Sequence, residues 1–210
     1  ARDFTTRVAK QIEPKTLEEK IEQYAQKDES KWDIGYQYLL NRGIDKKLIE
    51  KQKENNFVWT NKYGALCFST LNDKCVHIRG TKGDYKQTIG DKSDPYVVLG
   101  TNVNDYKTPL VLVESPIDAM SVSSIYQKNG AITFGGTSVQ KSGLNIQFCG
   151  FDNDKAGLKG LEKAKDIYNV EDWTPDKKLG KDWNDVLKAY KESEGKKREA
   201  IEKWLDNPTV

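Results

Sequence analysis

The chain has 210 residues, of which 36% are hydrophobic and 31% are charged, and this length allows one large domain or two small ones. Five Trp, ten Tyr and six Phe provide bulky side chains for a core, which excludes an intrinsically disordered chain. The net charge of +2 excludes a uniformly basic surface for nucleic acid. No run of residues approaches the ~18–20 consecutive apolar positions of a membrane span, and residues 1–20 are polar, unlike a signal peptide. We therefore expect a cytoplasmic protein without a membrane partner.

Cysteine and histidine are scarce, which limits the chemistry that the chain can support. The three cysteines, Cys67, Cys75 and Cys149, show no CxxC spacing. We therefore predict that each cysteine is a small buried hydrophobic residue and that the chain holds no structural zinc. His77 is the only histidine, which excludes a multi-histidine metal site. It lies in a strand pattern, and we expect a structural role for it.

The first 56 residues are typical of short, charged helices. Thr16-Leu-Glu-Glu19 has the form of a capping box, and apolar residues follow it at helical spacing. Ser30 is the expected cap of a second helix that Gly43 ends, and Asp45 begins a third. From residue 57 the apolar pattern changes to a two-residue period. Short strands joined by Asn, Asp and Gly turns predict an antiparallel meander, with strands near 57–59, 65–68, 75–78 and 96–99.

From Leu110 onward, strands alternate with helices. Leu110-Val-Leu-Val113 is a four-residue apolar run that suits a buried parallel strand, and a helix is expected over 116–128. Further strands are predicted over 131–134 and 145–151, and further helices over 156–167, 185–190 and 197–205. This alternation predicts an α/β fold with a parallel sheet covered by helices on both faces. We place an α+β part at 1–108, the parallel-sheet domain at 109–190 and a C-terminal helix at 191–210.

Four carboxylates are concentrated near the ends of the predicted strands. Residues 109–160 contain only four acids, and Glu114 directly follows the first strand, with Asp118 one helical turn further on. Asp152 and Asp154 follow the strand that ends at Phe151, and alternation along this segment turns both side chains to one side. Since functional groups gather at the carboxyl ends of parallel strands, we expect three or four carboxylates at one sheet edge, with Mg²⁺ between them. An acid after a strand also often caps the next helix, and for Asp118 that alternative stays open.

Two further groups of residues suggest contacts with phosphates. Gly135-Gly-Thr-Ser138 follows the second strand, where glycines allow close backbone approach to a phosphate and hydroxyls can donate to it; an ordinary turn is an equal alternative. The candidate phosphate or nucleotide residues are Gly135, Gly136, Thr137 and Lys141. Several basic side chains could line a groove for a nucleic-acid backbone, although a solvated surface is the stronger alternative for the lysines. These candidates are Arg42, Arg79, Lys82 and Lys86, with Lys46 and Lys47 nearby and Tyr85 as a stacking partner.

The sequence resembles the toprim domain, which DnaG-type primases, topoisomerases and some nucleases share. The resemblance lies in three acidic motifs, Val113-Glu-Ser-Pro-Ile-Asp118-Ala-Met, Phe151-Asp-Asn-Asp154-Lys-Ala-Gly157 and Lys181-Asp-Trp-Asn-Asp185. It is closest to primase-like toprim proteins of plasmids and other mobile elements, and it covers roughly residues 36–190. Upstream, Tyr38-Leu-Leu-Asn-Arg-Gly-Ile44 and Arg79-Gly80 resemble the basic amino-terminal subdomain of the primase core. The resemblance implies a toprim-type parallel sheet flanked by helices and preceded by a smaller α+β subdomain.

The resemblance also implies a role for each acid. Glu114 matches the general acid/base glutamate of the family, which also touches metal. Asp152 and Asp154 match its metal-binding aspartates. Asp118 and Asp182 match further acids of the primase metal site. The implied cofactor is Mg²⁺, with Mn²⁺ as a substitute.

One position of the third motif departs from the family. Asn184 stands where a primase usually has an Asp, and the neighbouring Asp185 is the expected substitute as a metal ligand. The resemblance implies Mg²⁺-dependent nucleotidyl transfer, in which a primer hydroxyl attacks a nucleoside triphosphate on a single-stranded DNA or RNA template. The implied setting is replication or transfer of a mobile element, with a helicase, a relaxase or a separate zinc-binding domain as partner. Two alternatives stay open: a toprim nuclease that uses the same acids, and a non-catalytic accessory protein that binds DNA.

Overall fold

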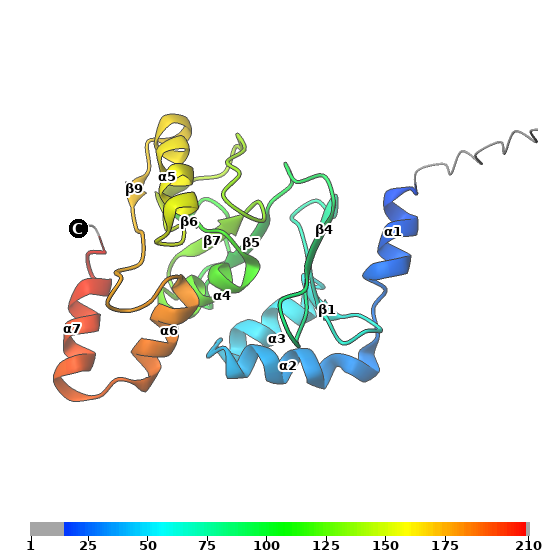
Figure 1. Cartoon of the computed structure of the whole chain (residues 1–210), viewed down its shortest axis with the longest axis horizontal. Coiled ribbons are helices and arrows are strands. Elements are labelled where there is room, and N and C mark those ends of the chain that lie inside the picture. Colours follow the sequence, from blue (N-terminus) through cyan, green and yellow to red (C-terminus); the bar gives the residue numbers. More distant parts are fainter. Residues whose placement is uncertain (1–14, 209–210) are drawn as a thin grey trace, which may run out of the picture.

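The computed structural model of the chain describes residues 15–208. It contains two β-sheets with helices packed around them (Figure 1). The first sheet has the strand order β1-β2-β3-β4, and the second has the order β5-β7-β6-β8-β9. Among the described residues, no helix is both long and apolar enough to cross a membrane.

The amino-terminal part consists of short helices and an antiparallel meander. Its helices are α1 (Leu17–Tyr24), α2 (Trp32–Asn41) and α3 (Lys46–Glu54), and its strands are β1 (Val58–Thr60), β2 (Leu66–Ser69), β3 (Cys75–Arg79) and β4 (Lys86–Gly90). Each strand pairs antiparallel with the next, which confirms the predicted meander for the first three strands. The fourth strand of this sheet, β4, is more polar than its neighbours and was not predicted.

Local capping chemistry determines where these helices begin. Thr16 forms the predicted capping box, because its Oγ1 accepts from the N–H of Glu19 while the Glu19 carboxylate accepts from the N–H of Thr16. Asp45 caps α3, also as predicted. The predicted cap at Ser30 is wrong. The carboxylate of Asp28 accepts from both the N–H and the hydroxyl of Ser30 and so caps the short 3₁₀ turn Glu29–Lys31, and α2 follows that turn without a side-chain cap of its own.

The second sheet is the predicted, mostly parallel one. Its parallel strands are β6 (Leu110–Leu112), β7 (Gly130–Thr133), β8 (Ile146–Cys149) and β9 (Glu171–Asp172). One edge strand, β5 (Tyr96–Leu99), runs antiparallel to β7. This corrects the prediction that residues 96–99 belong to the meander. All four residues of β5 are buried, because β5 has an apolar cluster on each of its faces and therefore belongs in a sheet that is covered on both sides.

Helices cover both faces of the second sheet, as predicted. α4 (Pro116–Ile125), α6 (Trp183–Glu192) and α7 (Gly195–Leu205) contribute to the apolar cluster on one face, and α5 (Lys155–Tyr168) contributes to the cluster on the other. Successive side chains of β6 point to opposite faces of the sheet and therefore pack in different clusters. Val111 packs on the side of α4 and α6, whereas Leu110 and Leu112 pack on the side of α5.

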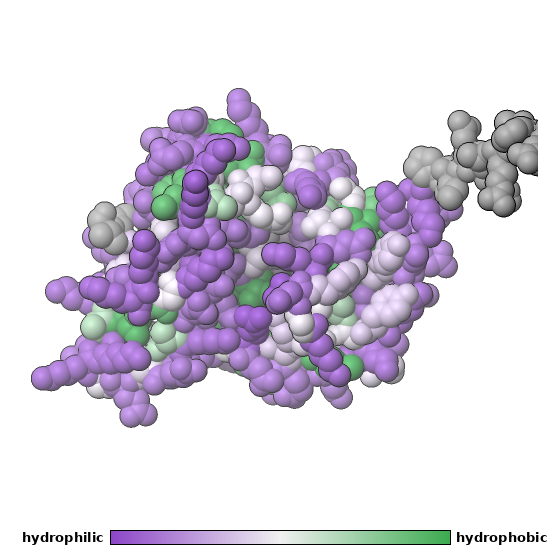
Figure 2. Space-filling view, viewed as in Figure 1, coloured by the Kyte–Doolittle hydropathy of each residue, from purple (hydrophilic) through white to green (hydrophobic). Residues whose placement is uncertain are grey.

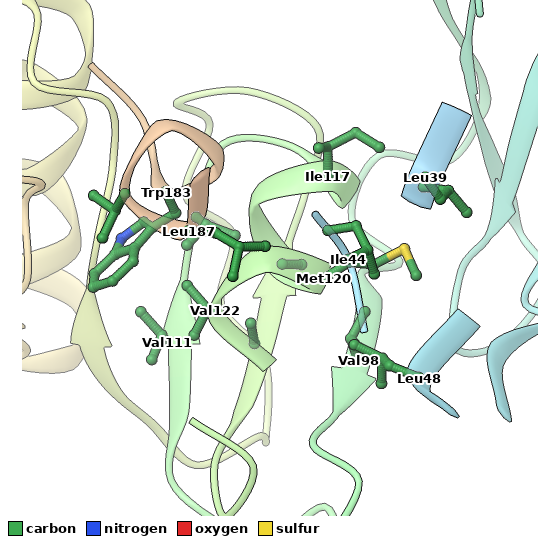
Figure 3. Close-up of a cluster of buried hydrophobic side chains, with 14 of the residues drawn as sticks. Leu39, Ile44, Leu48, Val98, Val111, Ile117, Met120, Val122, Trp183 and Leu187 are labelled. Carbon is green, nitrogen blue, oxygen red and sulfur yellow. The ribbon is translucent and has the colours of Figure 1, made fainter. Parts of the chain in front are cut away.

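One hydrophobic cluster joins the amino-terminal part to the second sheet. Leu39 of α2 and Leu48 of α3 are fully buried in the same cluster as Met120 of α4. In Figure 3, Met120 lies beside Ile44, with Trp183 of α6 at one end of the group and Leu39 and Leu48 at the other. The surface is different in character. Figure 2 shows hydrophilic side chains over most of the visible face, with apolar side chains in small, separate patches.

Because the two parts share this cluster, they should unfold together. Met120→Ala should lower the free energy of unfolding by about 2–5 kcal/mol, since Met120 is fully buried between them. Urea titrations followed by far-UV circular dichroism and by tryptophan fluorescence should give one coincident transition. Leu158→Ala is the matched control, because Leu158 is 48% exposed and should change stability by less than about 0.5 kcal/mol. Two separate transitions would contradict a shared core.

Candidate functional site

A cleft of about 660 Å³ lies between the amino-terminal part and the carboxyl ends of the strands of the second sheet. Its two walls differ in charge. The charged lining residues of the amino-terminal part are Arg42, Arg79, Asp84, Lys86 and Lys92. Those of the second part are Glu114, Asp118, Asp152, Lys181 and Asp182. A mainly basic wall thus faces a mainly acidic wall.

Glu114 lies where the central strands of the second sheet end. Its carbonyl oxygen accepts from Thr133 Oγ1 at 2.9 Å and from the N–H of Gly136 at 2.7 Å, which ties β6 to the end of β7. Its Oε1 accepts from the N–H of Asp152 at 3.1 Å, which ties β6 to the segment after β8. Burial, followed by the negative charge of Asp152, raises the pKa of Glu114 to about 7. This carboxyl can therefore take up or release a proton near neutral pH.

Asp152 and Asp154 share one cation. Lys181 Nζ lies 3.2 Å from Oδ2 of Asp152 and 2.9 Å from Oδ2 of Asp154. The two carboxylates thus turn to the same side, which is the placement expected from strand alternation. Asp154 also caps α5, and its bonds to backbone N–H groups, with Lys181, lower its pKa. The more buried Asp152 has a raised pKa, because desolvation outweighs the effect of Lys181.

Asp118 and Asp182 line the cleft together with Asp152, whereas Asp154 is not among the lining residues. Asp118 lies in the first turn of α4, where Ser115 Oγ donates to its Oδ2 at 2.6 Å. Burial and the nearby charge of Asp182 hold the pKa of Asp118 well above its usual range. Asp182 caps α6 by accepting from the N–H of Asp185 at 2.8 Å.

The acids lie on one wall without forming a closed metal cage. Within residues 15–208, no three His, Cys, Asp or Glu side chains are arranged so that they could hold a metal ion. The cluster is looser than expected, because Asp154 and Asp182 cap helices while Lys181 occupies the space between two carboxylates. The ammonium of Lys181 occupies a place that a bound metal cation could take. The two carboxylate oxygens that contact this ammonium are of the type that Mg²⁺ prefers as ligands.

Asn184 connects the two walls. Its Nδ2 donates to the carbonyl of Arg42 at 2.8 Å and to Ser121 Oγ at 3.0 Å, and Arg42 Nη1 donates to its Oδ1 at 3.1 Å. A carboxylate could not donate these two bonds, so the amide is the side chain that this position requires. Asp185, the expected substitute ligand, does not line the cleft. Its Oδ2 accepts from the backbone N–H of Lys181 at 2.9 Å.

The glycine loop after β7 brings the two sheets into contact. Gly135 has a φ of 77°, and a Cβ at this position would lie 2.4 Å from the ring of His77. His77 is buried, and its burial lowers its pKa to about 4, so the neutral ring packs against the loop at Gly135. The N–H groups of Gly135 and Gly136 donate to Thr133 Oγ1 and to the Glu114 carbonyl, so both are already engaged within the protein.

The other predicted residues divide into two groups. The cleft is lined by Arg42, Arg79 and Lys86 and by the two glycines after β7, Gly135 and Gly136. It is not lined by Lys82, Thr137 or Lys141. Arg79 and Lys86 are cross-strand partners in the β3–β4 ladder. Among the described residues neither makes an ion pair, so both charges are available to an anion in the cleft.

Sequence reasoning missed three charged residues of the cleft, Asp84, Lys92 and Lys181. Lys181 directly precedes Asp182 in the third acidic motif, and its charge at that place was a signal that could have identified it. Lys92 lies in the turn between β4 and β5, and nothing in the local sequence distinguishes it from other surface lysines.

Comparison with known proteins agrees with this geometry. Residues 111–187 match the protein family described as Toprim-like. The fold is similar to that of the primase fragment of the bacteriophage T7 primase-helicase protein, with 17% identity over 70% of this chain and 67% of that chain and a TM-score of 0.50. It is also similar to the DnaG primase catalytic domain bound to single-stranded DNA, with 15% identity over 82% of this chain and 73% of that chain and a TM-score of 0.53.

A third similar structure is the RNA polymerase domain of Mycobacterium tuberculosis primase DnaG, with 14% identity, 86% of this chain and 77% of that chain covered, and a TM-score of 0.51. No curated protein sequence gives a significant match to the chain. Residues 111–187 are therefore similar to the Toprim-like family, which covers about a third of the chain. The fold that surrounds its toprim-like domain is that of primase catalytic cores.

The close approach of α5 to the acidic wall depends on Gly157. A Cβ at Gly157 would lie 1.9 Å from the carbonyl oxygen of Asp152 and 3.0 Å from Glu114 Oε1. Gly157→Ala should therefore lower the free energy of unfolding by about 1–3 kcal/mol, although alanine favours a helix by about 1 kcal/mol elsewhere. Gly143→Ala is the control in the urea titration, because nothing lies within 4 Å of its added Cβ. Stabilisation by Gly157→Ala would refute this packing.

The raised pKa values of Glu114 and Asp118 predict that the protein without bound metal becomes less stable as the pH rises. Both carboxyls have a higher pKa in the folded than in the unfolded chain, so the folded state binds more protons above about pH 4. In EDTA, the free energy of unfolding should fall between pH 5 and pH 8, by about 1–2 kcal/mol. Urea titrations of Asp118→Asn should give a flatter profile, whereas Asp166→Asn, an exposed control on α5, should keep the wild-type slope. If the free energy of unfolding of Asp118→Asn falls with pH as steeply as that of the wild type, the raised pKa of Asp118 is contradicted.

Proposed function

We propose that this chain is a primase-like catalytic core that performs Mg²⁺-dependent nucleotidyl transfer on a single-stranded nucleic-acid template. The observation that carries the proposal is the cleft, in which the acidic strand ends of a toprim-like domain face a wall with several basic side chains. Template and triphosphate are both polyanions, so a basic wall binds them by charge. The acidic wall then supplies oxygen ligands for the cation that their phosphates require.

The basic wall would hold the phosphates. Arg79 and Lys86 lie opposite each other on β3 and β4, and Lys92 extends the same wall. Tyr85 is 50% exposed in the loop before β4, where its ring can stack on an unpaired base. Arg42 is held by Asn184 and by the Tyr38 hydroxyl, so it contributes a fixed positive charge at the junction of the walls.

The acidic wall would hold Mg²⁺ through Asp152 and Asp154, with Asp118 and Asp182 as further acids beside them. When bound, the cation would neutralise charge on the transferring phosphate and orient the attacking oxygen. We assign to Glu114 the proton that the primer 3′-hydroxyl loses as its oxygen attacks the α-phosphorus and pyrophosphate leaves. The raised pKa of Glu114 suits a group that must accept a proton and release it in each cycle.

Similar solved structures support the choice of substrate. The DnaG primase catalytic domain binds single-stranded DNA, and primase domains of the T7 protein bind an RNA/DNA hybrid and dTTP; the second is 20% identical, covers 78% of this chain and 87% of that one, and has a TM-score of 0.53. The T7 protein combines primase with helicase, which supports a helicase as partner. A relaxase or a zinc-binding domain is the alternative partner for a core that serves replication or transfer of a mobile element.

Polymerisation on a single strand tests the proposal directly. The protein is incubated with single-stranded DNA, labelled nucleoside triphosphates and Mg²⁺ or Mn²⁺, and the products are separated on a denaturing gel. We expect short new products from the wild type. The variant Asp152→Asn/Asp154→Asn should lose them by about 100-fold or more, because both shared oxygens lose their charge.

Asp166→Asn is the matched control, since Asp166 is exposed on α5 and outside the cleft lining, and it should retain full activity. Circular dichroism of each variant excludes loss of folding as the cause. Shortened input strands in place of new products would favour a toprim nuclease that uses the same acids to activate water. Binding of the strand on a native gel without either product would favour an accessory protein that binds DNA.

A further inference from the structure

Lys181 is the one basic side chain among residues 15–208 that forms ion pairs with the acids of the cleft. Its ammonium lies 3.2 Å from Asp152 Oδ2 and 2.9 Å from Asp154 Oδ2. The proposed function assigns these two carboxylates to Mg²⁺. Two cations cannot share the same carboxylate oxygens at this distance without strong repulsion, so the ammonium and the metal compete for one place.

The backbone of Lys181 is fixed on both sides. Its N–H donates to Asp185 Oδ2 at 2.9 Å, and its carbonyl accepts from the N–H of Asn153 at 2.9 Å. The preceding Gly180 has a φ of 148°, and a Cβ there would lie 2.1 Å from the Cβ of Asp185. The Cα of Lys181 therefore keeps its position next to the metal-binding segment, and only the side chain is free to change place.

The side chain of Lys181 reaches the two carboxylates from solvent. It is 57% exposed, and its ion pair with Asp154, which is 40% exposed, is accessible to water and weak, whereas its ion pair with Asp152, which is 16% exposed, is the stronger one that a divalent cation has to replace. Lys181 also lines the cleft, so an ammonium that leaves Asp152 and Asp154 moves toward the space between the two walls. A compact charge on a flexible stem is well suited to contact a phosphate oxygen there.

We propose that Lys181 is a built-in counter-ion that a divalent cation displaces from Asp152 and Asp154, and that its freed ammonium then binds the triphosphate. This inference rests on the proposed function. Without metal, Lys181 neutralises the two carboxylates and is withheld from the nucleotide. With metal, the same charge becomes available to the phosphates, so the metal and the triphosphate bind cooperatively.

Mn²⁺ binding to the full chain tests the competition without depending on activity. Electron paramagnetic resonance of free Mn²⁺ gives the affinity of the wild type, Lys181→Met and Lys178→Met. Lys181→Met should bind Mn²⁺ about 3–10-fold more tightly, because the competing charge is gone. Lys178→Met is the matched control in the same loop, where Lys178 is exposed, and it should bind like the wild type. Lys181→Arg keeps the competing charge and should bind no more tightly than the wild type.

Calorimetry with ATP and Mn²⁺ tests the second half of the exchange. Lys181→Met should bind ATP about 10-fold more weakly than the wild type at saturating Mn²⁺, since one charged hydrogen-bond donor to phosphate is lost. Thermal unfolding of each variant verifies that it is folded. Unchanged or weaker Mn²⁺ binding by Lys181→Met overturns the proposed exchange of the ammonium for the metal. It does not contradict the proposal that the wild type binds a metal at this site. Absence of Mn²⁺ binding in every variant overturns both the exchange and the metal-dependent function.

Discussion

The arrangement of the cleft depends on how the central parallel strands end together around Glu114. Its carbonyl receives two hydrogen bonds from the end of β7, and its carboxyl receives one from the segment after β8. These bonds bring Asp152 beside Glu114 without any metal. The like charges are tolerated because each acid has a partner of its own: a helix N-terminus for Asp154 and Asp182, a hydroxyl for Asp118 and an ammonium between Asp152 and Asp154. These structural contacts thus hold the acids together within the site.

The second wall is positioned by packing that crosses from one part of the chain to the other. Leu39 and Leu48 of the amino-terminal helices share a core with Met120, and Gly135 lets the loop after β7 approach His77 closely. The basic ladder of β3 and β4 is therefore held opposite the acidic strand ends. The basic wall carries most of the positive charge of the cleft, and the acidic wall carries most of its carboxylates. The cleft belongs to the whole chain, although the family match covers only residues 111–187.

Sequence patterns predicted the parts of the structure that short-range periodicity determines. The capping box at Thr16, the buried strand at 110–112 and the placement of Glu114 at its end follow from local chemistry. The strand at 96–99 was assigned to the wrong sheet, because an apolar run does not identify its partner strand. The looseness of the acid cluster and the position of Lys181 depend on a loop that folds back after β9, and such a contact has no signature in neighbouring residues.

The bridge made by Asn184 restrains how far the two walls can move apart. Its amide links Arg42 to Ser121 at the junction of the two walls, and the two parts also share a hydrophobic core. Swinging the walls apart would leave a buried amide without partners and expose apolar side chains to water. These contacts therefore hold the two walls at a fixed separation, and any ligand of the cleft would meet a space whose width they set.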